Sequence, residues 1–493
     1  MLGKQERWQE DLFVAGSLRD IVPDDHVLKR VDKVLDLSWL RDEVKDCYCA
    51  DNGRPGIDPE AAVRLMLAGL FQGIAHDRKL MREAQVNLAI RWFAGYRLSD
   101  TLPHHSSLTR IRQRWGAERF RRIFEKTVSQ CMAADLVSGE TVHVDATLIR
   151  ADVSWESLTT QHVEQVLAEN HQDDSPDDPN STGDADKPKR GRPAKNTNSK
   201  KPKKRSTTDP DATMSTSNKR LRLEPNYKQH TATDDKAGVI VDVELTTGET
   251  NEGKQLLEQV ERIEAATGKH LEVVTADASY AHGANYEALE DRKTEAVIPP
   301  QPQPKNPKRI PSRRFRYDSK HKVIRCPGGK LLKRSCYSES KSCWTYRAKS
   351  SDCRACKLRQ RCFSEGATSR TIVIADGHEA LLRARRDKIK GWPKEKWDAY
   401  VRHRWRVEGS HGEAKTQHCL RRAVRRGTAN VAIQVYLTAA VMNLKRLAGT
   451  LRSILAIWGD RKATSQPYGN ASSTQNSIYR SENTRPQVRK IAA

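Results

Sequence analysis

The sequence predicts a mixed α/β protein with a helical N-terminal domain, an α/β core and a small cysteine-rich β insertion. Three observations favour this fold class: apolar residues recur at helical spacing early in the chain, β-branched residues then alternate with period two, and six of the ten cysteines fall in one late segment. Because 493 residues exceed what one core can hold, we expect several domains. Their predicted bounds are 1–135 for the helical domain, 136–297 and 376–455 for the two parts of the core, 298–375 for the insertion and 456–493 for a disordered tail.

The charge of the chain indicates a polyanionic partner. A net charge of +24 and a sequence pI near 9.6 make nucleic acid the first candidate and an anionic membrane surface the competing one. No stretch reaches the roughly 18 apolar residues of a membrane helix, and the first residues carry no apolar run typical of a secretion signal. We therefore expect a cytoplasmic DNA-binding protein without a membrane partner, whose ten cysteines form no disulfide framework.

The N-terminal domain contains a helix suited to phosphate contact. Asp58 and the proline after it are typical of a helix start, and a second helix is expected from about 78 to 92. After the polar run 103–108, Arg110 and Arg112 lie near the start of a further helix capped by a serine. Arginines near a capped helix start favour contact with DNA phosphates, as in a helix-turn-helix. A helical bundle with a basic surface is the alternative.

Two predicted strands each carry an acid. Residues 141–149 alternate with period two and are rich in β-branched side chains, which places Asp145 within or just past a strand. A second β-rich segment from residue 271 leads to Asp277, after which a helix opens. Carboxylates at the C-terminal edge of strands lie where α/β sheets hold ligands and metals. For Asp277 taken alone, a helix cap is the alternative.

A long charged segment interrupts the core. Between about 159 and 222 the composition shifts to Asp, Pro, Ser, Asn, Lys and Thr, which predicts a disordered loop. Inside it, Arg190 and Arg192 belong to an Arg-Gly-Arg-Pro core flanked by lysines, which resembles an AT-hook. Such an extended segment would place its arginines along a narrow, A·T-rich minor groove. A nonspecific, solubilising segment is the alternative interpretation.

A predicted helix near residue 408 gathers one acid and three potential cations. Four residues fall on one narrow stripe at about 100° per residue: Arg404, Glu408, His411 and Lys415. Glu413 falls on the opposite face, so Glu408 is the better metal-binding candidate. An acid that holds a divalent ion, beside bases that hold the DNA backbone, is what metal-dependent phosphoryl transfer needs. Ordinary charge pairs on a solvated helix are the alternative.

Cysteine spacing predicts a zinc site in the insertion. Cys353 and Cys356 have the Cys-x2-Cys spacing of half a zinc knuckle, and Cys326 and Cys362 are the most natural completing pair. The insertion lacks a second Cys-x2-Cys, so unligated thiols in a small β-rich unit are the alternative. Catalysis by these cysteines is not expected, because no base is paired with them.

Asp145, Asp277 and Glu408 together predict a two-metal site. Three carboxylates on two strands and an adjacent helix can converge on two Mg²⁺ (or Mn²⁺) ions, one activating water or a DNA 3′-hydroxyl and the other stabilising the leaving oxygen. Carboxylates suit Mg²⁺ because it is a hard cation that prefers oxygen ligands. No general base is required, because metal coordination lowers the pKa of the nucleophile.

These motifs resemble those of DDE transposases of bacterial insertion sequences, in the class with a Tyr-Arg-Glu-Lys signature. The resemblance covers most of the chain: 54–59 resembles the opening of the class's DNA-binding domain, 144–147 its first acid motif and 275–280 its second. Arg404, Glu408 and Lys415 fit the spacing Arg-x3-Glu-x6-Lys. The cysteine-bearing insertion lies between the second Asp and the Glu, where this class carries an extra β-rich domain.

The resemblance implies a ribonuclease-H-like core that nicks DNA at transposon ends and joins the freed 3′-hydroxyl to target DNA. It also implies terminal inverted repeats and target DNA as partners, a homodimer on paired ends, and phosphate contacts from Arg404 and Lys415. One departure concerns the tyrosine of the signature, which falls at Val401 here, whereas Tyr400 stands one position away.

Other functions fit parts of the sequence. A transposase-derived DNA-binding protein that no longer cuts is the runner-up, and the three intact acids argue against it. A zinc-stabilised DNA-binding regulator leaves those acids unexplained. A metal-dependent nuclease without strand transfer is chemically close, and product analysis separates it from a transposase.

Overall fold

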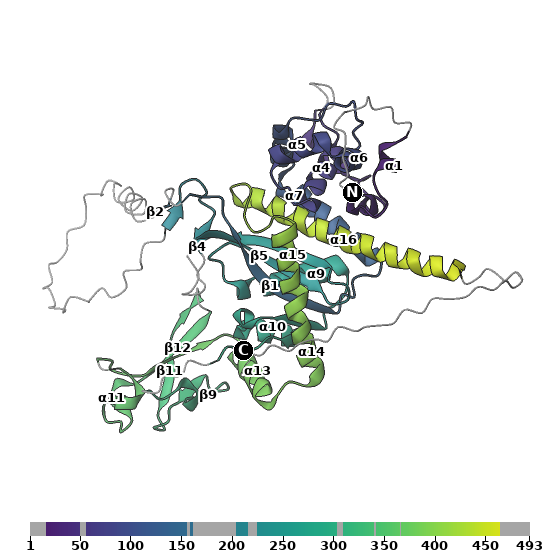
Figure 1. Cartoon of the computed structure of the whole chain (residues 1–493). Coiled ribbons are helices and arrows are strands. Elements are labelled where there is room, and N and C mark those ends of the chain that lie inside the picture. The colour runs from purple at the N-terminus through teal and green to yellow at the C-terminus, as the bar shows by residue number, and fades with distance from the viewer. Residues whose placement is uncertain are drawn as a thin grey trace, which may run out of the picture. The chain divides into compact units, whose positions relative to one another are not determined.

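The structure is a computed structural model, and it describes residues 16–49, 56–154, 158–160, 204–214, 224–302, 309–339, 342–364 and 366–463 (Figure 1). The chain divides into two compact units, Met1–Gly449 and Thr450–Ala493, and the fold of the first is described here. The AT-hook-like arginines Arg190 and Arg192 lie outside the described residues.

The N-terminal region is helical, as the sequence predicts. Its helices are α1 (Leu18–Ile21), α2 (Val27–Asp32), α3 (Leu40–Val44), η1 (Lys45–Cys47), α4 (Pro59–Phe71), α5 (Asp77–Val86), α6 (Leu88–Phe93) and α7 (His105–Ala133). Asp58 caps α4 by accepting backbone hydrogen bonds from Glu60 and Ala61. The single helix expected from 78 to 92 is two helices, because the side chain of Asn87 accepts from the Ile90 N–H and starts a new one.

Helix α7 differs from the sequence prediction at its start. His104, not a serine, is its N-cap, and its side chain accepts from the backbone N–H of Ser106. At Gly116 the backbone has φ 70° and ψ 172°, so the helix is kinked there. A side chain other than glycine rarely adopts this left-handed region, which explains a glycine at the kink.

The central sheet is mixed. Its strands are β1 (Thr141–Arg150), β4 (Thr213–Met214), β5 (Pro225–Asp234), β6 (Ile240–Thr247), β7 (Val273–Ala276) and β8 (Glu295–Val297). Their order is β4-β5-β1-β7-β8, and β6 also pairs with β5. The pairs of β5 with β1 and β6 are antiparallel, whereas β1, β7 and β8 run parallel. β1 is therefore the strand at which the sheet changes from antiparallel to parallel pairing.

Helices accompany this sheet, and one hydrophobic core joins them to the N-terminal region. They are η3 (Glu252–Lys254), α9 (Leu256–Thr267), η4 (Ala278–Tyr280), α10 (Gly283–Asp291), α13 (His378–Lys390), α14 (Lys394–His403), the π-helix η7 (Arg404–Glu408), α15 (Gly409–Gln417) and α16 (Thr428–Ala463). Buried residues of α4, α7, β1 and α16 belong to the same cluster, so the N-terminal helices share the core of the sheet. No helix in the described ranges has the length and apolar character needed to span a membrane.

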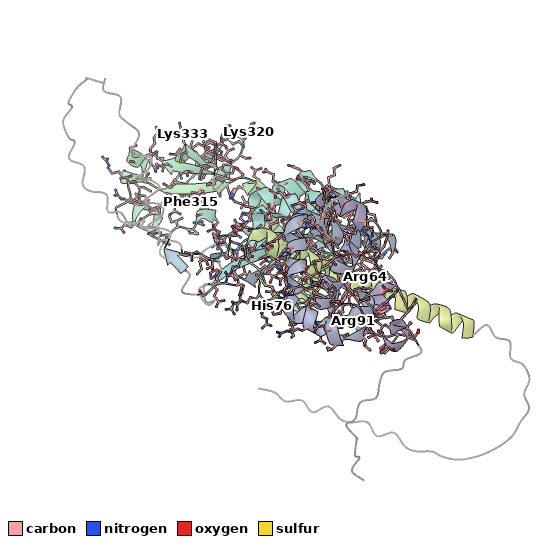
Figure 2. All side chains as sticks on the ribbon, turned by 90° about the horizontal axis from the view of Figure 1, so that it is seen from above. Arg64, His76, Arg91, Phe315, Lys320 and Lys333 are labelled. Atoms are coloured by element: carbon pink, nitrogen blue, oxygen red, sulfur yellow. The ribbon has the colours of Figure 1, made fainter. Side chains whose placement is uncertain are left out.

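The insertion forms a five-stranded antiparallel sheet with its own core. Its strands are β9 (Arg316–Asp318), β10 (Val323–Arg325), β11 (Leu331–Ser338), β12 (Cys343–Ala348) and β13 (Thr371–Ala375), in the order β13-β12-β11-β10-β9. Three short helices accompany them: η5 (Ser312–Arg314), α11 (Ser350–Arg354) and α12 (Arg359–Cys362). Phe315, labelled in Figure 2, is among the buried residues of this separate cluster.

Part of the segment predicted to be disordered has regular structure. Strand β2 (Leu158–Thr160) pairs with β3 (Lys204–Ser206), and residues 204–214 continue into β4. Asp209 is buried, and Tyr227 donates a hydrogen bond of 2.6 Å to its carboxylate. Polar composition predicts a solvated loop, but here long-range hydrogen bonds hold an acid inside the fold. Likewise, α16 continues through 456–463, into the predicted tail.

Candidate active site

The pairing of β1 with β7 brings Asp145 and Asp277 to the same edge of the sheet. The two strands are parallel, and Val144 lies opposite Ala276 in their register. The next residue along each chain is an acid, so the two carboxylates are neighbours at the carboxyl end of β7. The side chain of Asp277 also accepts a hydrogen bond of 2.8 Å from the Ser279 N–H and caps η4. Asp277 is therefore both the helix cap considered as an alternative and an acid at the end of β7.

Glu408 approaches from the helical segment formed by α14, η7 and α15. This segment contacts β1, β5 and β7 through α14 and η7. The Glu408 side chain is 60% exposed, and its Oε2 lies 3.5 Å from Arg404 Nε. Its charge acts on Asp145, where it helps to raise the pKa. The three acids that the sequence singled out therefore share one electrostatic environment.

The acids repel one another at this edge. Burial raises the pKa of Asp145 to about 7, and the charges of Asp277, Glu252 and Glu408 add to the shift. Burial also raises the pKa of Asp277, again with a contribution from Glu252. A divalent cation would relieve this repulsion by displacing protons. Within the described ranges no group of three or more His, Cys, Asp or Glu side chains already has the geometry of a metal site, so binding would draw the carboxylates together.

Glu252 is a fourth acid at this site, and the sequence analysis missed it. It begins η3 directly after the β6 turn, and its carboxylate lies 3.0 Å from the buried Lys228 ammonium. No periodicity marks this position, because a short 3-10 turn carries it. The proximity of β5 and η3, which is a tertiary contact, creates the site residue.

Lys415 and His411 lie on the same side of the helical segment, but Lys415 is charged and His411 is neutral. Lys415 Nζ donates a hydrogen bond of 2.6 Å to Thr147 Oγ1 on β1, and the charge of Asp145 is near enough to act on the ammonium. His411 is buried, with 7% of its surface exposed, and burial lowers its pKa to about 3. Its Nε2 lies 3.1 Å from Thr231 Oγ1. The prediction that His411 is a DNA-binding cation is wrong, because the ring is neutral and buried.

Glu413 is held by two cations inside the fold, whereas Arg404 is exposed. Glu413 receives a 2.8 Å ion pair from Lys445 and a 3.6 Å one from Arg446. Although burial opposes ionisation, hydrogen bonds from His418 and Lys445 hold the pKa of Glu413 at about 2. Arg404 keeps 82% of its side chain exposed. Glu413 is thus a structural acid away from Asp145, whereas Arg404 is accessible to a ligand beside Glu408.

Only one of the two arginines singled out on α7 is accessible. Arg110 is exposed, whereas Arg112 is 5% exposed and pairs with Asp77 at 2.8 Å. Arg425 also reaches Asp77, at 2.5 Å. The prediction of a DNA contact from Arg112 is wrong, because residues two apart on a helix are about 200° apart and face different ways. Arg112 instead ties α7 to Asp77 at the start of α5, and Arg425, before α16, pairs with the same carboxylate.

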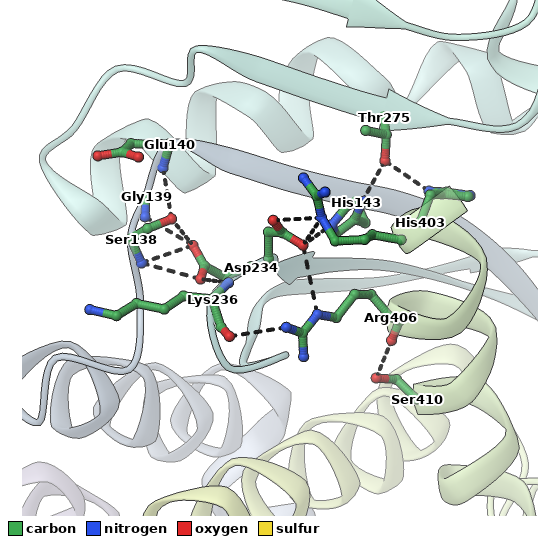
Figure 3. Close-up of polar contacts among 12 residues, drawn as sticks. Ser138, Gly139, Glu140, His143, Asp234, Lys236, Thr275, His403, Arg406 and Ser410 are labelled. Carbon is green, nitrogen blue, oxygen red and sulfur yellow. Dashed lines mark hydrogen bonds and ion pairs between the residues drawn. The ribbon is translucent and has the colours of Figure 1, made fainter. Parts of the chain in front are cut away.

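A buried hydrogen-bonded chain lies one step behind the acids (Figure 3). His143 on β1 and Thr275 on β7 each stand two residues before an acid, and His403 ends α14. The Thr275 hydroxyl lies 2.7 Å from His143 Nδ1 and 2.9 Å from His403 Nδ1. These contacts connect the two strands and the helix that carry the three acids.

The contact between His143 and Asp235 decides which groups donate and which accept in this hydrogen-bonded network. His143 Nε2 lies 3.0 Å from the Asp235 carboxylate, which can only accept, so Nε2 carries the proton. Burial lowers the pKa of His143 below its usual value and that of His403 to about 4, so both rings are neutral at pH 7. Thr275 therefore donates to His143 Nδ1 and accepts from His403 Nδ1. Asp235 is held in turn by Arg402 at 3.0 Å.

The π-helix changes the position of Tyr400 relative to Glu408. Val401, where the signature tyrosine was expected, is 47% exposed. The Tyr400 ring stacks on His403 with an interplanar angle of 3°. Burial raises the pKa of Tyr400, and the charges of Asp277 and Glu408 add to this shift. One π turn takes up one more residue than an α turn, and η7 lies between Tyr400 and Glu408.

The four cysteines proposed as zinc ligands come together in the insertion. Cys326 follows β10, Cys353 lies in α11, Cys356 follows that helix and Cys362 ends α12. All four are free thiols. Burial raises the pKa of Cys362, and charges on the other three cysteines add to the shift. Cys336 and Cys343 lie on β11 and β12.

Comparison with known protein families places two stretches of this chain. Residues 16–114 match a transposase domain family (DUF772), and residues 325–448 match a transposase DDE domain family. The second match includes Glu408 and most of the insertion. No curated protein sequence matches the chain.

Solved transposase–DNA complexes are among the structures with detectable similarity. A piggyBac transposase synaptic complex with hairpin DNA is 10% identical, with a TM-score of 0.30, over 90% of this chain and 81% of that one. A Mos1 transposase paired-end complex with the left transposon end is 13% identical, with a TM-score of 0.15, over 52% and 65%. The Mos1 strand transfer complex is 12% identical, with a TM-score of 0.16, over 77% and 85%.

Proposed function

We propose that this chain, which carries the two domains of a DDE transposase, cleaves DNA at the ends of an insertion sequence and joins them to target DNA. A DDE domain implies a polynucleotidyl transferase, and Asp145, Asp277 and Glu408 are the acids proposed to carry the reaction. The observation that supports this most directly is the parallel register that sets Val144 opposite Ala276 and so places Asp145 beside Asp277, with η7, which carries Glu408, in contact with β1. Glu413, by contrast, is tied to Lys445 at 2.8 Å.

The donor set fits a hard divalent cation. Carboxylate oxygens suit Mg²⁺ or Mn²⁺, and when bound such ions activate the attacking oxygen and stabilise the leaving one. Asp145 and Asp277 would hold the ions from the sheet, and Glu408 would close the site from η7. The exposure of Glu408 leaves the site open to a DNA strand, whereas Asp145 is four-fifths buried and forms its floor.

Cations beside the acids fit the DNA backbone. Arg404 is exposed next to Glu408, and the Lys415 ammonium sits on Thr147, two residues along β1 from Asp145. A phosphate at the metal site would lie within reach of both. Arg110 lies on the N-terminal region, where it would contact DNA outside the site. The net charge of +24 supports a long DNA footprint.

We assign to Tyr400 the role that the resemblance gives to the signature tyrosine. The extra residue between Tyr400 and Glu408 is taken up by the π-helix η7, and Tyr400 feels the charges of two acids. Its hydroxyl would donate to a phosphate oxygen of the strand that is cut. Single-turn π-helices recur at functional sites for this reason, since they change the register without breaking the helix.

The strand order supports a ribonuclease-H-like core. Three antiparallel strands, β6, β5 and β1, continue into the parallel strands β7 and β8, with one acid on β1 and one after β7. The insertion enters after β8, and Glu408 follows it. This order matches the fold that the resemblance implies.

The test uses the purified full chain with Mg²⁺ and a plasmid carrying the DNA that flanks its gene. We expect cuts at flanking inverted repeats that leave 3′-hydroxyl ends, mapped at nucleotide resolution. Asp277→Asn should reduce cleavage by about 1,000-fold or more, because loss of a metal-ligand charge costs several kcal/mol in the transition state. DNA binding should remain.

Asp291→Asn is the matched control, because Asp291 is an exposed acid at the end of α10. Equal cleavage by wild type and Asp277→Asn would refute the assigned site. Binding without cleavage by wild type, on paired ends with Mg²⁺ or Mn²⁺, would favour a transposase-derived DNA-binding protein. Cuts without strand transfer would indicate a nuclease.

A further inference from the structure

The insertion has little apolar core for its size. Between residues 309 and 375 its buried cluster contains nine residues, and one of them is Cys353. Units below about 70–80 residues rarely gain more than about 3–5 kcal/mol from a core and usually carry disulfides or a structural metal. The cysteines described here form no disulfide. A further stabilising element is therefore expected within this unit.

Two sulfurs converge on one side of the β10–β11 turn. A Cβ added at Gly328 would lie 3.5 Å from Cys356 Sγ and 3.7 Å from Cys326 Sγ. The two thiols therefore line the same small space, although they are 30 positions apart in the sequence. Glycine at residue 328 keeps that space open.

The turn that carries Cys326 presents backbone N–H groups to its sulfur. The Lys330 N–H lies 3.3 Å from Cys326 Sγ, and the Cys326 N–H donates to the Lys330 carbonyl at 2.8 Å. Gly329 has a φ of 79°, which lets the chain turn back around the sulfur. An N–H donor stabilises a thiolate more than a thiol, so the turn suits a metal-bound cysteine.

The other two cysteines lie in the short helices on either side of Cys356, Cys353 in α11 and Cys362 at the end of α12. The Cys356 N–H donates to the Cys353 carbonyl at 3.4 Å, so the two residues form one tight turn. Cys362 ends α12, and its carbonyl accepts from Arg370 at 2.7 Å. The Arg359 N–H donates to the Cys356 carbonyl at 3.0 Å, so α12, which ends at Cys362, starts directly after the turn of Cys353 and Cys356. Three of the four cysteines thus lie on consecutive short turns.

The surrounding charges suit an anionic centre. Four thiolates around Zn²⁺ carry a net charge of −2. A basic residue stands next to each of the four cysteines in sequence, namely Arg325, Arg354, Lys357 and Arg361, and Lys330 pairs with Asp352, the acid before Cys353. Such cations offset the negative charge without competing as ligands, since they cannot donate an electron pair while protonated.

We propose that Cys326, Cys353, Cys356 and Cys362 bind one structural Zn²⁺ ion that holds the insertion together. Four protein ligands fill the tetrahedral shell, so the site is closed and has no position for a substrate. The side chains do not have metal-site geometry in the described ranges, so binding would draw the sulfurs together. This site is independent of the acids proposed for DNA cleavage.

The first experiment measures metal in the purified full chain by plasma mass spectrometry, after expression with zinc supplied. We expect about one zinc per chain, resistant to mild chelation. The double variant Cys353→Ser, Cys356→Ser should contain far less than one equivalent. Cys336→Ser and Cys343→Ser are the matched controls in the same insertion, and both should keep the zinc.

A second experiment covers the case in which the double variant fails to fold. Wild-type protein is alkylated with and without a strong chelator, and modification of each cysteine is read by peptide mass spectrometry. We expect the four proposed ligands to become reactive only after chelation, whereas exposed Cys336 reacts in both conditions. Absence of zinc from the wild type, equal reactivity with and without chelator, or disulfides among these cysteines would overturn the proposal. DNA cleavage is not a readout, so failure here leaves the proposed function standing.

Discussion

Two pairs of polar side chains lie two residues apart along the segments of β1 and β7, and they differ in their contacts. His143 and Thr275 belong to a buried hydrogen-bond network in which donors and acceptors are matched. Asp145 and Asp277, two residues farther along, have pKa values that are raised by burial and by neighbouring acids. The polar groups of the first pair are satisfied within the protein, whereas the acids of the second pair would be neutralised by a bound cation.

This difference gives the two pairs separate roles: the neutral side chains join the elements, and the acids are left for a ligand. The neutral histidines join β1, β7 and α14 without adding charge near the acids. The acids are then held in place by the backbone, and their repulsion is available to bind cations. A charged residue in place of either histidine would weaken this separation, because a cation there would partly neutralise the acids before a metal arrives.

The largest expected effect concerns the stability of the metal-free protein. The pKa of Asp145 is about 7 in the fold, whereas an unperturbed aspartate has a pKa of 3.8, so the folded state holds more protons between these values. The free energy of unfolding should therefore fall as pH rises from about 4 to about 7, by at most about 4 kcal/mol from this group. Mg²⁺ should stabilise the protein more at about pH 8 than at about pH 5. Denaturant unfolding with and without Mg²⁺ measures both.

Two variants sharpen this test. Asp145→Asn should lose most of the slope and most of the Mg²⁺ effect. Glu413→Gln should behave in the opposite way, because the Glu413 pKa is held at about 2 and its contribution is present above the unfolded value of 4.5. It should lower stability at neutral pH and leave the Mg²⁺ effect intact. A Mg²⁺ effect of equal size in wild type and Asp145→Asn would exclude Asp145 as a ligand.

The next largest effect is expected from the buried hydrogen-bond network of His143, Thr275 and His403. Thr275→Val removes the hydroxyl that joins His143 and His403 at nearly constant volume. Leaving two ring nitrogens without a partner should cost about 1–3 kcal/mol of stability, and looser positioning of the acids should reduce cleavage about 10–100-fold. Cleavage rates at saturating Mg²⁺, alongside unfolding curves, separate the two effects.

Thr438→Val is the matched control for that change. Thr438 is buried in α16, and within the described residues its hydroxyl makes no hydrogen bond. Its replacement should leave cleavage unchanged and cost little stability. If Thr275→Val loses stability but cleaves at the wild-type rate, the chain has only a structural role.

Local patterns predicted the acids, but tertiary contacts decided which neighbours they have. Alternation and β-branching located β1 correctly, and Asp145 with it, because both are properties of consecutive residues. The register that sets Val144 opposite Ala276 joins segments more than a hundred residues apart. Glu252 entered the site through such a long-range contact, so no local pattern marked it.

The errors have the same origin. His411 has helical spacing suitable for a DNA contact, but its ring packs against Thr231 on β5. The spacing of residues along a helix does not reveal which side of that helix packs against a sheet. Arg112 could have been separated from Arg110 by helical period alone, since neighbours two apart cannot share a face. The role of Tyr400 stayed open in the sequence, because the π-helix η7 between it and Glu408 has no sequence pattern of its own.

A smaller effect is expected at Tyr400. Tyr400→Phe keeps the ring that stacks on His403 and removes the hydroxyl near the acids. One lost hydrogen bond to a charged phosphate is worth about 1.5–3 kcal/mol, so we expect roughly a tenfold or greater loss of cleavage with unchanged stability. Val401→Thr is the control at the neighbouring, exposed position and should cleave normally. Equal rates for both variants would contradict the assigned role.

The smallest effect separates the two arginines of α7. Arg110→Ala should weaken DNA binding modestly and reduce the slope of log K against log salt by about 1, because one phosphate contact is lost. Its unfolding should not change, since Arg110 is exposed. Arg112→Ala should do the reverse, lowering stability by breaking the buried pair with Asp77 while the salt slope stays the same. If both variants lower the salt slope equally, α7 contacts DNA through a face that the present packing buries, and Arg112 must leave Asp77 when DNA binds.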